Sequence, residues 1–264
     1  MWMIQSWTRM KNRFDLTGKV ALITGGGRGL GKAMGRGFAE NGATIMLASR
    51  SEEELRSAAE EIRDGIDANV EWLCTDMTQR DQVSRLASDT LRRFGRVDIL
   101  VNNAGIIRRE DAIKFTEKDW DDVIDLNLKT VFFFAQAAAR QFLAQGTGGK
   151  IVNVASMLSF QGGIRVPSYT ASKSGVMGIT RLMANEWAQH RVNVNAIAPG
   201  YMATNNTAAL RADKGRSDAI LERIPAGRWG KPEDLAGPVV FLASSASDYV
   251  NGYTIAVDGG WLAR

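Results

Sequence analysis

The chain has 264 residues, and its content of 45% hydrophobic and 23% charged residues is that of an ordinary globular protein, which excludes the disordered and fibrous classes. The formal net charge of +4 is modest and no long run of basic residues is present. We therefore expect an anionic small molecule, and no nucleic acid, as the partner.

The cysteine and histidine counts limit the chemistry further. Cys74 is the only cysteine and His190 the only histidine, so an internal disulfide is excluded, and neither a Ser-His-Asp hydrolase nor a histidine-based metal site is expected. No apolar run reaches the length of a membrane span, and the cluster Met1 to Ile4 ends before signal-peptide length. We expect a cytoplasmic protein with no membrane partner, in which residues 1–15 form an extension before one catalytic domain at 16–264.

The first predicted unit is a buried strand, Lys19 to Thr24, followed by a glycine-rich loop and a helix that ends near Asn41. Glycines let the backbone approach a pyrophosphate, and the helix N-terminus adds a partial positive charge. A tight turn without a ligand is the alternative, but the position in the first turn of a repeating strand-helix chain favours a dinucleotide site. The contacts expected here are Gly25, Gly27, Arg28, Gly29, Leu30 and Gly31.

The second strand, Thr44 to Ser49, bears on the choice of cofactor. NAD-specific sites of this fold place a carboxylate at the end of this strand, to accept from the ribose 2′-hydroxyl. Here Ser49 and Arg50 take that place, and Glu52 is better read as a helix-start charge. Arg28 and Arg50 with the Ser49 hydroxyl favour NADP(H), with NAD(H) as the alternative if both arginines lie on a solvated rim. Ser51 and Glu54 form a capping-box pattern at the start of the next helix.

Strands three and four are predicted at Val70 to Thr75 and Val97 to Val101. Each ends in small or polar residues, at the edge where open α/β sheets bind ligands. Asp76 can accept from an adenine amine or, alternatively, cap the helix that begins near Gln79. The cofactor contacts expected at these strand ends are Asp76, Met77, Asn103, Ala104 and Gly105.

A long amphipathic segment, Glu117 to Gln145, places Asn127 among apolar neighbours, where a buried amide needs hydrogen-bond partners. Within it, Val131 to Phe134 has more apolar surface than one face of a sheet covers, as does Val176 to Ile179 further along. These segments predict a homotetramer. The alternative is that Phe132 to Phe134 all lie inside the domain.

The stretch from Ser156 to Lys173 carries the predicted chemistry. Ser156 follows the apolar strand Ile151 to Ala155, and Pro167 suits the first turn of a helix on which Tyr169 and Lys173 are spaced i and i+4. A cation near a phenol favours the phenolate and lowers its pKa, although desolvation offsets part of this. Tyr169 is therefore a candidate general acid/base and Ser156 a hydrogen-bond partner of the same substrate oxygen. A solvated surface helix is the alternative.

The remainder supplies a sixth strand, Val192 to Ala198, a polar segment at 201–217 that is expected to be a mobile lid, a helix starting at Pro232, and a seventh strand, Tyr253 to Val257. Further cofactor contacts are expected from Tyr169, Lys173, Pro199, Gly200, Met202 and Thr204. Strands that alternate with helices throughout predict an α/β fold with a doubly wound, parallel, seven-stranded sheet in three layers.

Together, the motif Thr-Gly-x-x-x-Gly-x-Gly at 24–31, Asn-Asn-Ala-Gly at 102–105, Asn127, Ser156, Tyr169 and Lys173 resemble the short-chain dehydrogenase/reductase family over residues 16–264. The resemblance implies a Rossmann fold with strand order 3-2-1-4-5-6-7 and a nicotinamide dinucleotide. It also implies that Tyr169 is the acid/base, that Lys173 binds the nicotinamide ribose and lowers the pKa of Tyr169, that Ser156 orients the carbonyl, and that Asn127 holds a water of a proton relay.

A narrower resemblance from Ile99 to Arg264 is to the family members that interconvert keto and hydroxy forms of sugar acids such as 2-dehydro-3-deoxy-D-gluconate or 2-deoxy-D-gluconate. Gluconate 5-dehydrogenation, reduction of 3-oxoacyl carrier proteins and a non-catalytic nucleotide-binding regulator are the alternatives. The substrate carboxylate is expected at Arg108, Arg109 or Arg165, because an arginine offers a planar fork to a carboxylate.

Overall fold

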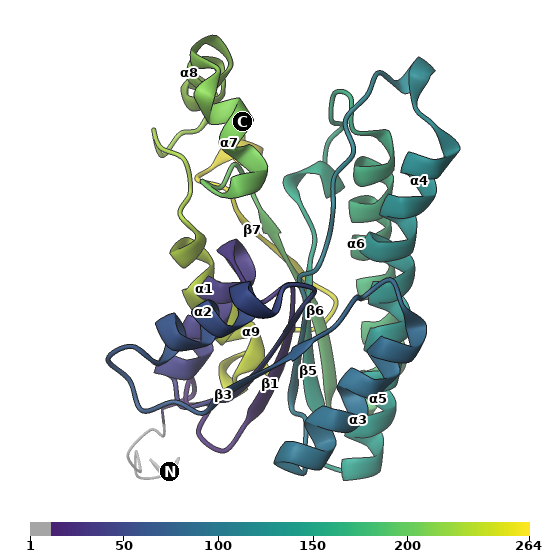
Figure 1. Ribbon diagram of the computed structural model, residues 1–264, viewed down its shortest axis with the longest axis vertical. Helices are drawn as coiled ribbons and strands as arrows, with labels where there is room; N and C mark the ends of the chain where they lie inside the picture. Colours follow the sequence, from purple (N-terminus) through teal and green to yellow (C-terminus); the bar gives the residue numbers. More distant parts are fainter. Residues whose placement is uncertain (1–11) are drawn as a thin grey trace, which may run out of the picture.

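The computed structural model describes residues 12–264, so the predicted cluster Met1 to Ile4 and most of the predicted extension lie outside the described residues. Seven parallel strands form one sheet in the order β3-β2-β1-β4-β5-β6-β7, which confirms the predicted fold class and strand order (Figure 1). The strands are β1 (Val20–Thr24), β2 (Thr44–Ser49), β3 (Val70–Cys74), β4 (Ile99–Asn102), β5 (Gly149–Val154), β6 (Val192–Pro199) and β7 (Thr254–Val257).

The central strands are covered on both faces. Every residue of β1, β4 and β6 is buried, whereas the edge strands β3 and β7 are largely half-buried. This explains why the central strands read as continuous apolar runs rather than as alternating patterns. All six strand pairings are parallel, so the carboxyl ends of the strands meet at one edge.

Helices cover the sheet on both sides (Figure 1). One layer packs the large hydrophobic cluster around Phe38 and contains α1 (Gly29–Glu40), α2 (Glu52–Arg63) and α9 (Ala236–Ala243). The other packs around Phe134 and Phe142 and contains α3 (Arg80–Phe94), α4 (Glu117–Ile124), α5 (Thr130–Gln145) and α6 (Pro167–Trp187). Within residues 12–264, no helix combines the length and the apolar character that crossing a membrane requires.

Two segments differ from the simple pattern. The long amphipathic segment is not one regular helix, because a π-helical turn at Asp125–Lys129 separates α4 from α5. Such turns often mark functional sites, and this one contains Asn127. The predicted lid contains the short helix α7 (Ala208–Ala212) and the start of α8 (Lys214–Arg223), which extends six residues beyond the predicted end at 217.

Candidate active site

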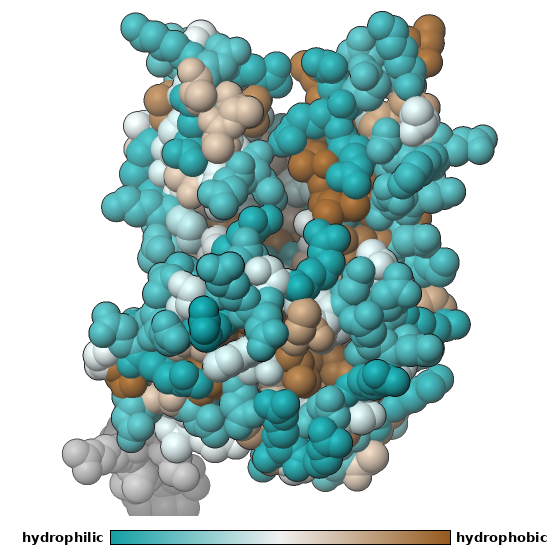
Figure 2. All heavy atoms as spheres, in the orientation of Figure 1, coloured by the Kyte–Doolittle hydropathy of each residue, from teal (hydrophilic) through white to brown (hydrophobic). Residues whose placement is uncertain are grey.

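A cavity of about 1100 Å³ lies at the carboxyl ends of the strands. Figure 2 shows it as a hollow between two raised parts of the surface, with apolar side chains on one wall. In Figure 1 these two parts correspond to α7 and α8 on one side and to the ends of α4 and α6 on the other. This is the edge at which open parallel sheets bind ligands, and the volume slightly exceeds the usual range of about 300 to 1,000 Å³ for ligand pockets.

Most of the predicted site residues line this cavity. They are Gly25, Gly27, Arg28, Gly29, Leu30, Ser49, Arg50, Asp76, Met77, Asn103, Ala104, Gly105, Arg109, Ser156, Arg165, Tyr169, Lys173, Gly200 and Thr204. Five predicted residues do not line it, namely Gly31, Arg108, Asn127, Pro199 and Met202. Of these five, Gly31 and Asn127 contact residues that do line the cavity, namely Gly25 and Ile106.

The glycine loop has the shape that a pyrophosphate requires. A Cβ on Gly31 would lie 2.2 Å from the carbonyl oxygen of Gly25, so only glycine lets α1 begin this close to the loop. The first turn of α1 contains no acidic residue, and Arg28 at its N-cap makes no side-chain capping bond. Within residues 12–264, the amide of Lys32 donates to the Arg28 carbonyl oxygen, whereas those of Gly29, Leu30 and Gly31 can bind an anion, so these residues fit a dinucleotide.

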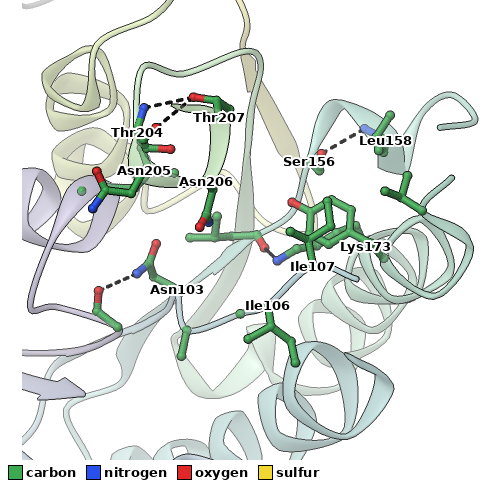
Figure 3. A pocket seen from close by; sticks show the side chains of 18 of the residues that line it. Asn103, Ile106, Ile107, Ser156, Leu158, Lys173, Thr204, Asn205, Asn206 and Thr207 are labelled. Atoms are coloured by element: carbon green, nitrogen blue, oxygen red, sulfur yellow. Dashed lines mark hydrogen bonds between the residues drawn. The ribbon is translucent and has the colours of Figure 1, made fainter. Parts of the chain in front are cut away.

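Asn103 fastens the loop to the neighbouring strand end. Its Nδ2 donates to the carbonyl oxygens of Thr24 at 2.9 Å and Gly25 at 3.0 Å, and its own amide donates to the Thr24 hydroxyl at 3.0 Å (Figure 3). The side chain at this cavity wall thus fixes the ends of β1 and β4 relative to each other. Asp76 follows the end of β3 and accepts from the amide and the hydroxyl of Thr78. Gln79, and not Asp76, is the N-cap of α3.

Tyr169 and Lys173 lie on the first turns of α6, which begins at Pro167 as predicted. Lys173, which is labelled in Figure 3, has its Nζ 5.7 Å from the centroid of the Tyr169 ring and donates to the Val154 carbonyl oxygen at 2.6 Å. The Lys173 side chain is buried, and this burial lowers its pKa to about 8. The lysine therefore changes its charge within the range in which enzymes work.

The pKa of Tyr169 moves in the opposite direction from the expectation. Burial raises the pKa of the phenol, and a hydrogen bond with the Ser156 side chain and the positive charge of Arg109 reduce this rise. The expected lowering by Lys173 is therefore wrong for the protein without ligands, because desolvation outweighs the attraction of nearby charge. In this state the phenol is protonated at neutral pH.

Ser156 is at the start of a short 3₁₀ turn that follows β5. Its hydroxyl accepts from the amide of Leu158 at 3.1 Å, and its amide donates to Ser159 Oγ at 3.4 Å (Figure 3). Ser159 Oγ in turn donates to the carbonyl oxygen of Lys173 at 2.6 Å. This chain of contacts sets the position of the Ser156 hydroxyl relative to α6.

Asn127 is fully buried within the π-helical turn. Its Oδ1 accepts from the amide of Ile106 and its Nδ2 donates to the carbonyl of Ile106, both at 2.9 Å. Ile106 lines the cavity directly after the Asn-Asn-Ala-Gly turn. The side chain thus anchors this turn, and its Nδ2 also donates to Ser172 Oγ at 3.4 Å, while the predicted water relay stays a prediction.

The three predicted substrate arginines have different surroundings. Arg108 does not line the cavity and pairs instead with Asp119 at 3.3 Å and Asp122 at 3.6 Å, which leaves Arg109 and Arg165 of the three alternatives at the cavity wall. Arg109 lines the cavity and donates to the carbonyl oxygen of Asn206 in the lid at 3.3 Å. Arg165 also lines the cavity but pairs with Asp111 at 3.0 Å and Glu110 at 3.4 Å.

Several charged and aromatic residues of the cavity wall were not predicted from the sequence. Arg216 and Arg223 come from α8, Trp261 follows β7, and Glu54 comes from α2. Arg223 lies over the Trp261 ring with its Cζ 4.0 Å from the centroid. The seven-residue spacing of the two arginines, which places them on one helix face, was the available signal. Among residues 12–264, no cluster of metal-binding side chains is present.

Comparison with known proteins places these features in context. The family model for short-chain dehydrogenases matches residues 19–215. A 2-dehydro-3-deoxy-D-gluconate 5-dehydrogenase of Escherichia coli is 64% identical over 95% of this chain and 98% of its own. The enzyme of the same name from Dickeya dadantii is 65% identical over 96% of this chain and 99% of its own.

Solved structures agree with this comparison. A chain from Agrobacterium tumefaciens with bound NADP is 57% identical, with a TM-score of 0.87 over 96% of this chain and all of that one. A gluconate 5-dehydrogenase from Burkholderia cenocepacia in complex with NADP and tartrate is 42% identical, with a TM-score of 0.89 over 96% of this chain and 98% of that one.

Proposed function

The chain belongs to the short-chain dehydrogenase family, and from this premise we propose that it interconverts a hydroxyl and a keto group of a sugar acid such as 2-dehydro-3-deoxy-D-gluconate. It is an NAD(P)-dependent oxidoreductase acting on CH–OH groups. The observation that carries the substrate proposal is the meeting of the Tyr169 phenol, the Ser156 hydroxyl and the Arg109 guanidinium in one cavity.

The cofactor proposal is NADP(H) in preference to NAD(H). The free amides at the start of α1 suit the pyrophosphate, and Arg28, Ser49 and Arg50 lie where a 2′-phosphate would be read. Two solved relatives hold NADP. When bound, a nicotinamide dinucleotide supplies or accepts the hydride at the substrate carbon.

The roles proposed for the chain's own residues follow from their protonation states. The raised pKa of Tyr169 keeps a proton on the phenol at neutral pH, so the phenol can donate it to a substrate carbonyl oxygen during reduction. Ser156 hydrogen-bonds the same oxygen and orients it. Below about pH 8 the Lys173 ammonium carries its charge close to the ring and favours the transient phenolate. Asn127 is a positioning residue that fixes Ile106.

Arg109 is proposed to bind the substrate carboxylate. Its side chain lies on the cavity wall, and its positive charge reduces the rise in the pKa of Tyr169. It also donates a hydrogen bond to the carbonyl oxygen of Asn206 in the lid. Unlike Arg165, it has no ion pair within residues 12–264. Arg216 and Arg223 on α8 add positive charge on the opposite wall, which suits an anionic substrate.

Two broader features are also proposed. One is a homotetramer, supported by the 41% exposure of Phe133 on α5, which also shows that the alternative with Phe132 to Phe134 all inside the domain is wrong. The other is a reducing compartment such as the cytoplasm, supported by Cys74 being an exposed free thiol.

The test is turnover with a panel of substrates in the wild type and in Tyr169→Phe. We expect 2-dehydro-3-deoxy-D-gluconate to be turned over more efficiently than D-gluconate or a 3-oxoacyl thioester. Tyr169→Phe should lower kcat by at least about 100-fold while NADPH still binds, because the substitution removes only the phenolic hydroxyl that donates the proton. Tyr253→Phe, at an exposed tyrosine outside the cavity, is the matched control and should keep full turnover.

Two results would contradict the proposal. Retained turnover in Tyr169→Phe would show that another group moves the proton. A preference for the acyl thioester would overturn the sugar-acid assignment while leaving the family unaffected.

A further inference from the structure

Glu54, a residue of the first turn of α2, reaches the end of the cavity where β2 meets the glycine loop. Its Oε1 accepts from Arg28 Nη1 at 2.9 Å. A Cβ on Gly27 would lie 3.0 Å from Ser49 Oγ and 3.2 Å from Glu54 Cβ, so the loop, the end of β2 and Glu54 are close neighbours. All of these residues line the cavity.

This is the place at which the two nicotinamide dinucleotides differ. In this fold a carboxylate beside the end of the second strand accepts from the ribose 2′-hydroxyl of NAD(H), and an arginine accommodates the 2′-phosphate of NADP(H). Ser49 occupies the strand end itself, and a carboxylate and a guanidinium lie beside it, bound to each other. A guanidinium that binds a carboxylate has fewer donors left for a phosphate.

We propose that Glu54 weakens the preference for NADP(H) over NAD(H) by competing with the 2′-phosphate for Arg28. NADP(H) binding exchanges the carboxylate on Arg28 for the phosphate and leaves the Glu54 charge near that phosphate. NAD(H) binding leaves the ion pair intact, and the second Glu54 oxygen can accept from the 2′-hydroxyl. Arg50 has no ion pair within the described part of the chain, so it attracts the phosphate without such an exchange. This role presupposes the proposed dinucleotide site and adds to it a residue that weakens its selectivity.

The size of the effect follows from exposure. The Arg28 and Glu54 side chains are 61% and 39% exposed, so water and salt screen their attraction. Removing the carboxylate should therefore change each dissociation constant by about three- to tenfold at low ionic strength. The change should diminish as salt is added.

The experiment measures the dissociation constants of NADPH and NADH, by nicotinamide fluorescence, in the wild type, Glu54→Gln and Glu54→Ala. We expect both substitutions to tighten NADPH binding and weaken NADH binding. The matched control is Glu53→Gln, which removes the same charge from the same helical turn at an exposed residue outside the cavity. It should leave the ratio of the two constants within about twofold.

A double-mutant cycle tests the competition itself. In an Arg28→Ala background, Glu54→Gln should improve NADPH binding by less than half the factor seen with Arg28 present, because no guanidinium remains to be released. An unchanged NADPH to NADH ratio in both Glu54 variants overturns the inference alone. If Glu54→Gln improves NADPH binding by the same factor without Arg28, the effect is simple charge repulsion between Glu54 and the phosphate, and the competition is overturned. If neither dinucleotide binds to the wild type or to any variant, the proposed function is overturned as well.

Discussion

Lys173 is a buried lysine whose positive charge costs stability. Its pKa of about 8 in the folded protein lies well below the 10.5 of an unperturbed lysine. Between these two values the unfolded chain binds more protons than the folded chain, so the free energy of unfolding rises with pH through this window. At pH 7 both states are protonated and the full cost of burying the charge is present. A shift of this size corresponds to about 3 kcal/mol.

Lys173→Met should therefore abolish turnover and yet stabilise the fold at pH 7. We expect its free energy of unfolding to exceed that of the wild type by about 1 to 2 kcal/mol, since loss of the bond to Val154 offsets part of the gain. The difference should shrink as the pH rises from 7 to 10. Urea unfolding at pH 7, 8.5 and 10 measures it.

Lys118→Met is the control for this measurement, because Lys118 is an exposed lysine on α4. Its effect on unfolding should be small and independent of pH over the same range. A pH-independent difference for Lys173→Met would show that its charge is not destabilised by burial.

At the scale of single residues, the sequence identified the groups on strand ends better than those on the cavity rim. Ser156, Tyr169 and Asn103 were predictable because each follows a recognisable strand or begins a helix with a proline signal. Arg108 and Arg109 are adjacent in sequence but have different partners. Arg108 pairs with Asp119 outside the cavity, whereas Arg109 lies on the cavity wall and donates to the carbonyl oxygen of Asn206. Glu54 was not predicted as a site residue because its position matches a capping pattern, and only the fold brings its side chain to Arg28.

At the scale of elements, the turn from β1 into α1 is the tightest connection of the site. Gly31→Ala would place a methyl group 2.2 Å from the Gly25 carbonyl oxygen and 2.7 Å from Asn103 Nδ2. Backbone must move to accept it, so we expect a loss of at least about 2 kcal/mol in unfolding free energy and a large loss of dinucleotide affinity. Thermal unfolding and NADPH titration measure the two effects.

Gly237→Ala is the matched comparison, since Gly237 lies in α9 with open space where its Cβ would be. A helix gains from alanine, so this variant should be unchanged or up to about 1 kcal/mol more stable. Equal losses in both variants would contradict the close approach at Gly31.

The elements themselves were predictable to within about two residues where the pattern is strong, as for β2 and the start of α6. The π-helical turn at Asp125–Lys129 was not, because the apolar periodicity of α4 continues into α5 and one extra residue barely changes it. The helical course of the lid was also missed. Its polar composition indicates a surface segment but does not distinguish a helix from a loop.

At the scale of the whole molecule, the outer surface of one helical layer bears exposed apolar side chains. The layer of α4, α5 and α6 leaves four large apolar side chains exposed, with Trp120 and Phe133 at 41%, Leu143 at 46% and Leu182 at 48%. Phe134, next to Phe133, is buried in the core. The outer surface of this layer therefore exposes apolar area that association would bury.

The proposed homotetramer gives a mass that light scattering can measure. Four chains of 28.8 kDa correspond to about 115 kDa and two to about 58 kDa. We expect the wild type at micromolar concentration to give the tetramer mass. Combining Phe133→Glu with Leu182→Glu should give the dimer mass, because four charges, two from each chain, would be buried in one interface. Ile113→Glu adds a charge at an apolar residue that is 94% exposed and outside these helices, so it should leave the tetramer intact. A wild-type mass of 28.8 kDa would exclude the assembly, and an unchanged mass in the double variant would locate the interface elsewhere.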